Sequence, residues 1–234
     1  MQIASFQKLT LLDFPGRLAC IVFTPRCNFR CGFCHNPELV LPELTQNLPL
    51  IEPQNFFAFL KKRLGLLEGV CLTGGEPTLQ KDLPDFLAEI KELGFQTKLD
   101  TNGSNPKVLA KLIRKKLLDY VALDVKFSPL SYSRFTGYDN FEKIQESRDI
   151  LFAAKIETEF RTTLIQGIHT LAEFEEILCF LRGAQKYCLQ NFSAKQGVLV
   201  PDFEKRKGLT PQQLREFQTK AESYVVNCEI RADT

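Results

Sequence analysis

The sequence has little that would mark a membrane or nucleic-acid-binding protein. No stretch approaches the roughly 20 consecutive apolar residues of a membrane-spanning helix. The N-terminus also lacks the long apolar core of a signal peptide. The 234 residues carry a formal net charge of only +2, which gives no electrostatic reason to expect nucleic acid or an anionic membrane as a partner. With 44% hydrophobic residues and no internal repeat, the composition is that of an ordinary globular protein of one domain.

The cysteines do not have the distribution of a disulfide framework. Of the eight, three are clustered and five are scattered, mostly inside apolar runs. The scattered ones are Cys20, Cys71, Cys179, Cys188 and Cys228. We predict that these five are buried thiols, and that the protein works in a reducing cytoplasm.

The three clustered cysteines are Cys27, Cys31 and Cys34, separated by three and then two residues. Thiolates at this spacing can converge on one inorganic centre, and they favour soft metals and iron–sulfur clusters. Three cysteines cannot give every iron of a four-iron cluster a ligand, so one iron would stay open to a group other than protein. The preceding apolar run, 18–23, predicts a buried strand, which places the cysteines on a loop that leaves a strand end.

A structural zinc site is the alternative interpretation of the same cysteines, with His35 as the fourth ligand. It is less favourable, because His35 directly follows Cys34 and paired zinc ligands usually lie two to four residues apart. A disulfide is weaker still, since three clustered cysteines cannot all pair.

Strands and helices alternate along the chain. Apolar runs predict six strands, at 18–23, 69–73, 95–99, 120–124, 156–164 and 187–192, with a short seventh at 225–230. Helical periodicity predicts the connecting helices, and their ends carry capping signals such as Gly94 and the pairs Thr170 with Glu173 and Thr210 with Gln213. Repeated strand–helix units of this kind indicate a parallel sheet, either a partial barrel of about six strands with helices outside or a doubly wound open sheet.

Polar residues follow the second predicted strand. Gly74 and Gly75 would let a ligand approach the backbone closely, and Pro77 fixes the chain so that the preceding carbonyls are exposed. Together with Glu76 they offer the acceptors that an ammonium group needs. We expect Glu76 to matter more for ligand affinity than for folding; a plain turn is the alternative.

Further polar residues follow the third and fourth strands. Asp100, Thr101 and Asn102 end the third, and Asp124 and Lys126 end the fourth. Because adjacent parallel strands end at the same edge of a sheet, we expect the two aspartates to lie close together. Such a pair either raises one pKa or recruits a cation, whereas a helix cap and a solvated ion pair are the plainer interpretations.

The cysteine stretch, with Phe33 before the last cysteine, resembles the cluster loop of radical S-adenosylmethionine enzymes. The wider segment, from the Asp13-Phe14-Pro15-Gly16 motif through the Cys34-His35-Asn36-Pro37 motif, is similar to activating enzymes of glycyl-radical proteins. Within these it is most similar to the activating protein of anaerobic ribonucleoside-triphosphate reductase. The resemblance covers most of the chain and favours the partial barrel over the open sheet. It implies one domain, 1–234, with a core of about 14–192 and an extension at 193–234.

The resemblance also implies roles for single residues. Cys27, Cys31 and Cys34 would bind a [4Fe–4S] cluster, and the loop with Glu76 would bind the amino group of the methionine moiety. The remaining implied ligand contacts come from Phe33, His35, Asn36, Gly74, Gly75, Pro77, Asp100, Thr101, Asn102, Asp124, Lys126 and Arg161.

Among these contacts, His35 and Asn36 would lie near the adenine. Asp100 and Asp124, with the residues beside them, would hold a monovalent cation next to the methionine carboxylate. Arg161 would either reach that carboxylate or form a structural ion pair. Asp13 is the candidate catalytic residue, near the place where a peptide substrate enters.

The implied reaction is the reductive cleavage of S-adenosylmethionine. One electron from the cluster breaks a carbon–sulfur bond and yields methionine and a deoxyadenosyl radical, which takes a hydrogen atom from a backbone glycine of a partner enzyme. The implied partners are a glycyl-radical enzyme, foremost anaerobic ribonucleotide reductase, and a low-potential electron donor such as flavodoxin or ferredoxin. Two other interpretations stay open: a small-molecule radical enzyme such as a deazaguanine synthase, and a non-enzymatic zinc- or cluster-binding module.

Overall fold

The fold is a curled sheet with its helices on the outside. The computed structural model describes residues 1–195 and 197–231, and in this part eight strands form one sheet in the order β1 to β8. β1 (Ser5–Thr10) is antiparallel to β2 (Ala19–Thr24), and every later neighbour is parallel. The parallel strands after β2 are β3 (Gly69–Gly74), β4 (Gln96–Thr101), β5 (Tyr120–Asp124), β6 (Glu157–Leu164), β7 (Tyr187–Asn191) and β8 (Cys228–Arg231).

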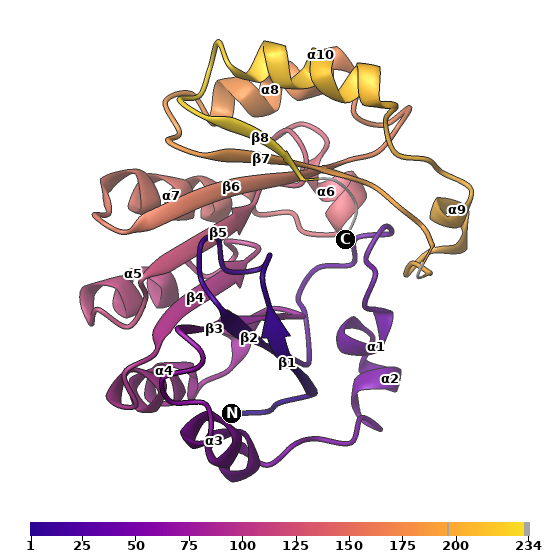
Figure 1. The fold of residues 1–234 in the computed structure, drawn as a ribbon. Helices are drawn as coiled ribbons and strands as arrows, with labels where there is room; N and C mark the ends of the chain where they lie inside the picture. The colour runs from indigo at the N-terminus through magenta and orange to yellow at the C-terminus, as the bar shows by residue number, and fades with distance from the viewer. Residues whose placement is uncertain (196, 232–234) are drawn as a thin grey trace.

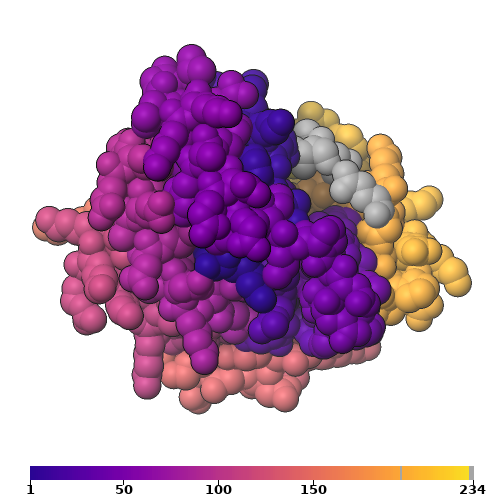
Figure 2. All heavy atoms as spheres, turned by 90° about the horizontal axis from the view of Figure 1, so that it is seen from below, coloured from indigo at the N-terminus to yellow at the C-terminus, as the bar shows by residue number. Residues whose placement is uncertain are grey.

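The sheet curls without closing, since the order runs from β1 to β8 with no pairing between these two edges among the described residues. Figure 1 shows the strands following one another around the curl. The predicted partial barrel is therefore confirmed. Both ends of the chain contribute a strand to it, and seen from below the N-terminal and C-terminal parts of the chain adjoin each other on one face (Figure 2).

The longer helices connect successive parallel strands and cover the outside of the sheet (Figure 1). They are α3 (Pro53–Lys61), α4 (Leu83–Glu92), α5 (Pro106–Arg114), α7 (Phe141–Ala153), α8 (Leu171–Phe180) and α10 (Pro211–Ala221). Shorter helices lie in the loops: α1 (Pro37–Val40), α2 (Pro42–Thr45), η1 (Pro77–Leu79), α6 (Tyr132–Thr136) and α9 (Pro201–Glu204). In the part of the chain that the structure describes, none of the helices has the length and apolar character needed to cross a membrane.

Strand alternation gives the sheet two different faces. On β4, Leu99 is buried in the core between sheet and helices, whereas Lys98 and Asp100 face the barrel interior and contact each other there. The interior face of the neighbouring strands is also polar, with Asp124 on β5 and Arg161 on β6. The curl therefore collects charged side chains that an ordinary hydrophobic barrel interior would not contain.

The capping signals are borne out to different degrees. Thr210 and Gln213 form the complete capping box of α10. At α8 the Thr170 side chain accepts from the backbone N–H of Glu173, but the Glu173 carboxylate turns away to Ser128 and Ser131. A tertiary contact thus replaces half of the predicted box.

Two sequence expectations differ from the structure. The N-terminal strand β1 was not predicted, because its residues are mostly exposed and show no apolar run. Of the five cysteines predicted to be buried thiols, Cys179 is exposed and Cys228 is half-buried. α8 buries Phe174, Ile177 and Leu178, and the next residue, about 100° further round the helix, points to solvent.

Candidate active site

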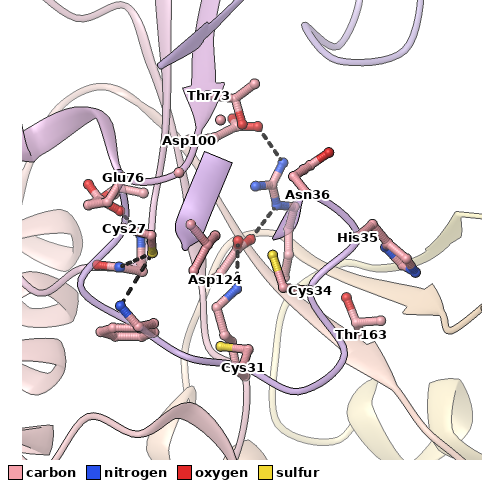
Figure 3. A pocket seen from close by; sticks show the side chains of 18 of the residues that line it. Cys27, Cys31, Cys34, His35, Asn36, Thr73, Glu76, Asp100, Asp124 and Thr163 are labelled. Atoms are coloured by element: carbon pink, nitrogen blue, oxygen red, sulfur yellow. Dashed lines mark hydrogen bonds and ion pairs between the residues drawn. The ribbon is translucent and has the colours of Figure 1, made fainter. Parts of the chain in front are cut away.

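One cavity of about 290 Å³ lies where the cluster loop meets the carboxyl ends of the parallel strands (Figure 3). It brings together nearly all residues that the sequence assigns to the site. Those that line it are Asp13, Cys27, Cys31, Phe33, Cys34, His35, Asn36, Gly74, Gly75, Glu76, Asp100, Thr101, Asn102, Asp124, Lys126 and Arg161. Pro77 is the exception: it is buried at the first position of η1, where its missing N–H costs nothing.

The three clustered thiols lie in the wall of this cavity, where Cys31 is buried and Cys27 and Cys34 are half-buried. Burial raises the pKa of Cys27 to about 11 and that of Cys31 to about 12, and it also raises the pKa of Cys34. These thiols therefore carry protons in the protein alone, and metal binding would release them. The donor set of three soft sulfur ligands around one cavity fits an iron–sulfur cluster with one open iron.

The zinc alternative loses support from the geometry. Among the described residues, no three His, Cys, Asp or Glu side chains are grouped closely enough for a single metal ion. His35 points away from the cysteines: its Nε2 lies 2.5 Å from the carbonyl oxygen of Ser193, and its ring stacks on Phe192. In a four-iron cluster each cysteine binds a different iron, so the sulfur atoms do not need to converge on one point.

The cluster loop is held by segments that are distant in sequence. The backbone N–H groups of Leu199 and Val200 donate to the carbonyls of Cys34 and Gly32, at 2.9 and 3.0 Å. The ring of Phe203 packs so closely on Gly32 that a Cβ there would lie 2.5 Å from it. The extension after β7 thus fixes one side of the loop, a contact that the sequence does not reveal.

Cys27 has hydrogen-bond donors of its own. The backbone N–H of Phe29 lies 3.4 Å from its Sγ, and the side-chain amide of Asn102 lies 3.9 Å from it (Figure 3). Asn102 also donates to the side-chain oxygen of Asn28 at 3.0 Å, which fixes its amide. Donors of this kind stabilise a thiolate, and around bound clusters they raise the reduction potential.

The glycine pair after β3 has a structural explanation. Gly74 has a positive φ of 116°, and a Cβ there would lie 2.3 Å from the backbone nitrogen of Thr24. A Cβ on Gly75 would lie 2.0 Å from the carbonyl oxygen of Arg26. We predicted close approach by a ligand, whereas the close approach seen here is made by the chain itself, just before the cluster loop.

Glu76 is buried and fully hydrogen-bonded within the protein. Its carboxylate accepts from Thr78, from the hydroxyl of Thr101 at 2.8 Å and from the backbone N–H of Asn102 at 2.7 Å. It thereby caps η1 and joins the ends of β3 and β4. The sequence predicts that Glu76 matters more for ligand affinity than for folding. In the structure its carboxylate accepts hydrogen bonds from the protein, so Glu76 also has a structural role.

We therefore predict that Glu76→Gln lowers the stability of the protein without any ligand. In glutamine, an NH₂ group replaces one of the two carboxylate oxygens that accept hydrogen bonds here. At least one buried hydrogen bond is therefore lost, which lowers the free energy of unfolding by about 1–3 kcal/mol. Urea denaturation of the metal-free variant measures this loss. The matched control is Glu89→Gln on the exposed side of α4. An unchanged urea midpoint for Glu76→Gln would contradict the structural role.

The two aspartates lie together, as predicted, with Arg161 between them. Its Nε is 2.8 Å from Asp124 and its Nη1 is 3.0 Å from Asp100 (Figure 3). Lys126 adds a contact of 3.1 Å to Asp124. Burial alone would raise the pKa of both carboxyls, but Arg161, with Lys98 at Asp100 and Lys126 at Asp124, holds both below the usual value.

The carboxylate pair therefore recruits cations of the protein and does not raise either pKa. Arg161 is an ion-pair partner of both carboxylates, as one of its two predicted roles requires. A monovalent cation would share these carboxylates with Arg161 and Lys126, and it stays a prediction.

Asp13 reaches the cavity from a different direction. It lies in the loop between β1 and β2, at the end where the parallel strands begin, and accepts from the hydroxyl of Thr10 at 2.5 Å. The next residue, Phe14, packs on Tyr120 at the start of β5. Asp13 therefore faces the barrel interior from the end opposite the cluster loop.

Several further residues, which the sequence did not single out, also line the cavity. They are Phe29, Val40, Thr73, Thr163 and Gln190. Thr163 lies two positions beyond Arg161 on β6 and is paired with Gln190 on β7. Because side chains alternate along a strand, Thr163 could have been predicted to face the cavity from the position of Arg161. Gln190 could not, because its place depends on the register between β6 and β7.

A family model described as the radical SAM superfamily matches residues 21–181, which include most of β2, the cluster loop and the parallel strands β3 to β6. This chain belongs to the radical SAM superfamily. Its cofactors are accordingly a [4Fe–4S] cluster and S-adenosylmethionine, and the cavity lined by three cysteines is where the residues fit them.

Known relatives of this radical SAM protein include activating enzymes. A Methanocaldococcus jannaschii protein, provisionally named a glycyl-radical enzyme activating enzyme, is 32% identical over 235 residues, or 98% of this chain and 95% of that protein. The pyruvate formate-lyase-activating enzyme of Clostridium pasteurianum is 28% identical over 239 residues, or 89% of this chain and 94% of that one. A Thermococcus kodakarensis protein, provisionally named a GTP 3′,8-cyclase, is 33% identical over 153 residues, which are 64% of this chain and 48% of that protein.

Solved structures support the fold. Streptococcus suis SuiB superposes with a TM-score of 0.62 at 18% identity, over 92% of this chain. The chain spans about half of that structure, 49% of its length. A domain of a pyruvate-formate lyase-activating enzyme from Bacteroides vulgatus gives a TM-score of 0.56 at 16% identity, over 71% of this chain and 99% of that domain.

Proposed function

We propose that this chain activates a glycyl-radical enzyme. In this proposal, it uses S-adenosylmethionine and one electron to take a hydrogen atom from a backbone glycine of its partner. The products are methionine, deoxyadenosine and a glycyl radical on the partner. The partner proposed first is anaerobic ribonucleoside-triphosphate reductase, and the electron donor is a flavodoxin or ferredoxin.

The observation that carries this proposal is the extent of the similarity. The two activating enzymes match along nearly their entire length, at 95% and 94%. The GTP 3′,8-cyclase matches over 48% of its length, so the segments that distinguish a cyclase have no counterpart in this match. A match over nearly the entire length includes the cofactor-binding core of an activating enzyme and also the segments around that core, which select the substrate.

The cluster and S-adenosylmethionine, when bound, supply a carbon radical at the adenosyl group by one-electron cleavage of a carbon–sulfur bond. The protein's own part is to bind, orient and shield. Cys27, Cys31 and Cys34 provide the sulfur ligands. Arg161 and Lys126 are two cationic side chains that line the cavity, and they would contact the ligand's carboxylate.

The other end of the ligand would lie toward the loop after Cys34. The resemblance places adenine near His35 and Asn36, and both side chains line the cavity. The glycine of the partner would have to enter this same cavity, which Asp13 also lines. Shielding the radical from water prevents it from being quenched before transfer.

A small-molecule radical enzyme is the second candidate, and the partial similarity to the GTP 3′,8-cyclase is what favours it. In that case the cavity would bind a nucleotide or nucleobase precursor instead of a peptide. The two candidates differ in where the abstracted hydrogen comes from.

Electron paramagnetic resonance tests the proposed function directly. Reduced, reconstituted protein is incubated without oxygen with S-adenosylmethionine and either anaerobic ribonucleotide reductase or pyruvate formate-lyase. We expect a glycine-centred radical with one of the two, and slow cleavage of S-adenosylmethionine without a partner. Absence of a protein radical with both, together with fast turnover of a small molecule, would contradict the proposal.

A further inference from the structure

A second layer of charge lies in the barrel interior beneath the cavity. Lys98 on β4 and Glu159 on β6 are both fully buried, with 0% exposure. Lys98 is two residues before Asp100 and Glu159 is two residues before Arg161, so each lies on the same strand face as its neighbour, one layer deeper. Neither residue lines the cavity, and nothing in the proposed chemistry uses them.

Each deep residue contacts groups of opposite charge in the upper layer. The ammonium of Lys98 donates to Asp100 and lies 4.0 Å from Glu159. The guanidinium of Arg161 lies 4.0 Å from the same Glu159 oxygen, in addition to its contact with Asp100. Asp100 is therefore held by Lys98 from below and by Arg161 from the side.

The deep layer extends to the last strand of the sheet. Glu159 accepts from Nη1 of Arg231 on β8 at 3.0 Å and from the hydroxyl of Tyr120 on β5 at 2.9 Å. Arg231 is partly exposed at the edge of the barrel, with 23% of its side chain accessible. The side-chain contacts thus connect β4, β5, β6 and β8 across the interior.

Within the described part of the chain, this interior ion network contains more positive than negative charge. Its cations are Lys98, Lys126, Arg161 and Arg231, and its anions are Asp100, Asp124 and Glu159. One positive charge is therefore left over. Arg161 and Lys126 are the cations of the network that line the cavity and can contact a carboxylate there, and Asp13 and Glu76, which lie outside the network, line it as well.

Stability alone does not account for these buried charges. Replacing a buried ion pair by apolar residues of similar size is often neutral or stabilising, because removing charges from water is costly. What a buried network does provide is a fixed arrangement, since each charge has few alternative partners once it is desolvated.

We propose that Lys98 and Glu159 are positioning residues that hold Asp100 and Arg161 in the arrangement that binds the amino-acid end of S-adenosylmethionine. The proposal depends on the cofactors of the superfamily and on ligand binding at this floor. It does not depend on a glycyl-radical partner, so it can fail while the proposed function holds, and the reverse.

The test compares Lys98→Met and Glu159→Gln with the wild-type protein after anaerobic cluster reconstitution. S-adenosylmethionine affinity is titrated by the change it causes in the spectrum of the reduced cluster. We expect at least a tenfold loss of affinity in both variants, with the iron content and the ligand-free cluster spectrum unchanged.

The iron content and the ligand-free cluster spectrum separate positioning from a general loss of stability. A variant that is merely destabilised would also bind less iron, whereas a variant that has lost only the positioning of Asp100 and Arg161 keeps its cluster and binds S-adenosylmethionine more weakly.

A double variant covers the case in which either single variant fails to fold. Lys98→Met with Glu159→Gln removes one charge of each sign, so the network keeps its net charge and is expected to fold. Under the proposal the double variant still binds S-adenosylmethionine weakly, because Asp100 and Arg161 have lost their support. Wild-type affinity in the double variant, or in the single variants, would overturn it.

Discussion

Replacing Cys31 by alanine is expected to give a folded protein that assembles no four-iron cluster. The thiol is buried in the cavity wall and would bind one of the irons, so its loss leaves two cysteines for a cluster that needs three. Iron and sulfide analysis after anaerobic reconstitution measures the effect. Wild type should contain about four irons per chain, and the variant should contain close to none. Cys27→Ala and Cys34→Ala should behave in the same way.

Two cysteines outside the cluster loop serve as controls. Cys71 is as fully buried as a ligand cysteine, in the interior face of β3, and Cys179 is exposed on α8. Alanine at either position should leave the iron content unchanged. Stoichiometric zinc in wild-type protein reconstituted with iron and sulfide would refute the cluster assignment.

Asp13→Asn is expected to uncouple cleavage of S-adenosylmethionine from radical transfer. Asp13 lines the cavity from the loop before β2, whereas the cluster ligands lie on the loop after β2. The substitution should therefore spare cluster assembly and ligand binding. If Asp13 orients the partner's glycine, losing it should reduce the glycyl radical yield at least tenfold, since holding two reactants in contact is worth several kcal/mol.

The measurement combines spin counting with an isotope label on the partner. With a deuterated glycine, wild type should transfer deuterium to deoxyadenosine, and Asp13→Asn should do so far less often. Asp85→Asn, on the exposed side of α4, is the matched control. Equal radical yields in Asp13→Asn and wild type would remove Asp13 from the transfer step. Deuterium arriving from a small nucleobase precursor, with no protein radical, would favour the small-molecule enzyme.

The sequence could predict those parts of the site that depend on local pattern. Three cysteines at close spacing lie on one loop in any fold. The carboxyl ends of parallel strands meet at one edge, so the sequence alone predicts that Asp100 and Asp124 lie close together. The barrel follows from the alternation of strands and helices together with the family resemblance, which favoured a curled sheet over an open one.

The parts that the sequence could not predict depend on contacts between distant residues. Glu76 appeared to be a free loop carboxylate, because its donors on the following strand are recognisable only in three dimensions. Arg161 could be placed on a strand but not between two aspartates from neighbouring strands. β1 has no apolar pattern, since it is an edge strand whose side chains mostly face water.

The hydrogen bonds from Leu199 and Val200 to the cluster loop have a consequence for how the protein is made. The segment that holds the loop is synthesised after it, since Leu199 lies 165 residues beyond Cys34. At about 5–20 residues per second, the three thiols are without these hydrogen-bonded contacts for on the order of ten seconds. The nascent chain is then most open to oxidation, and we expect iron to be delivered after the segment with Leu199 and Val200 has packed on the loop.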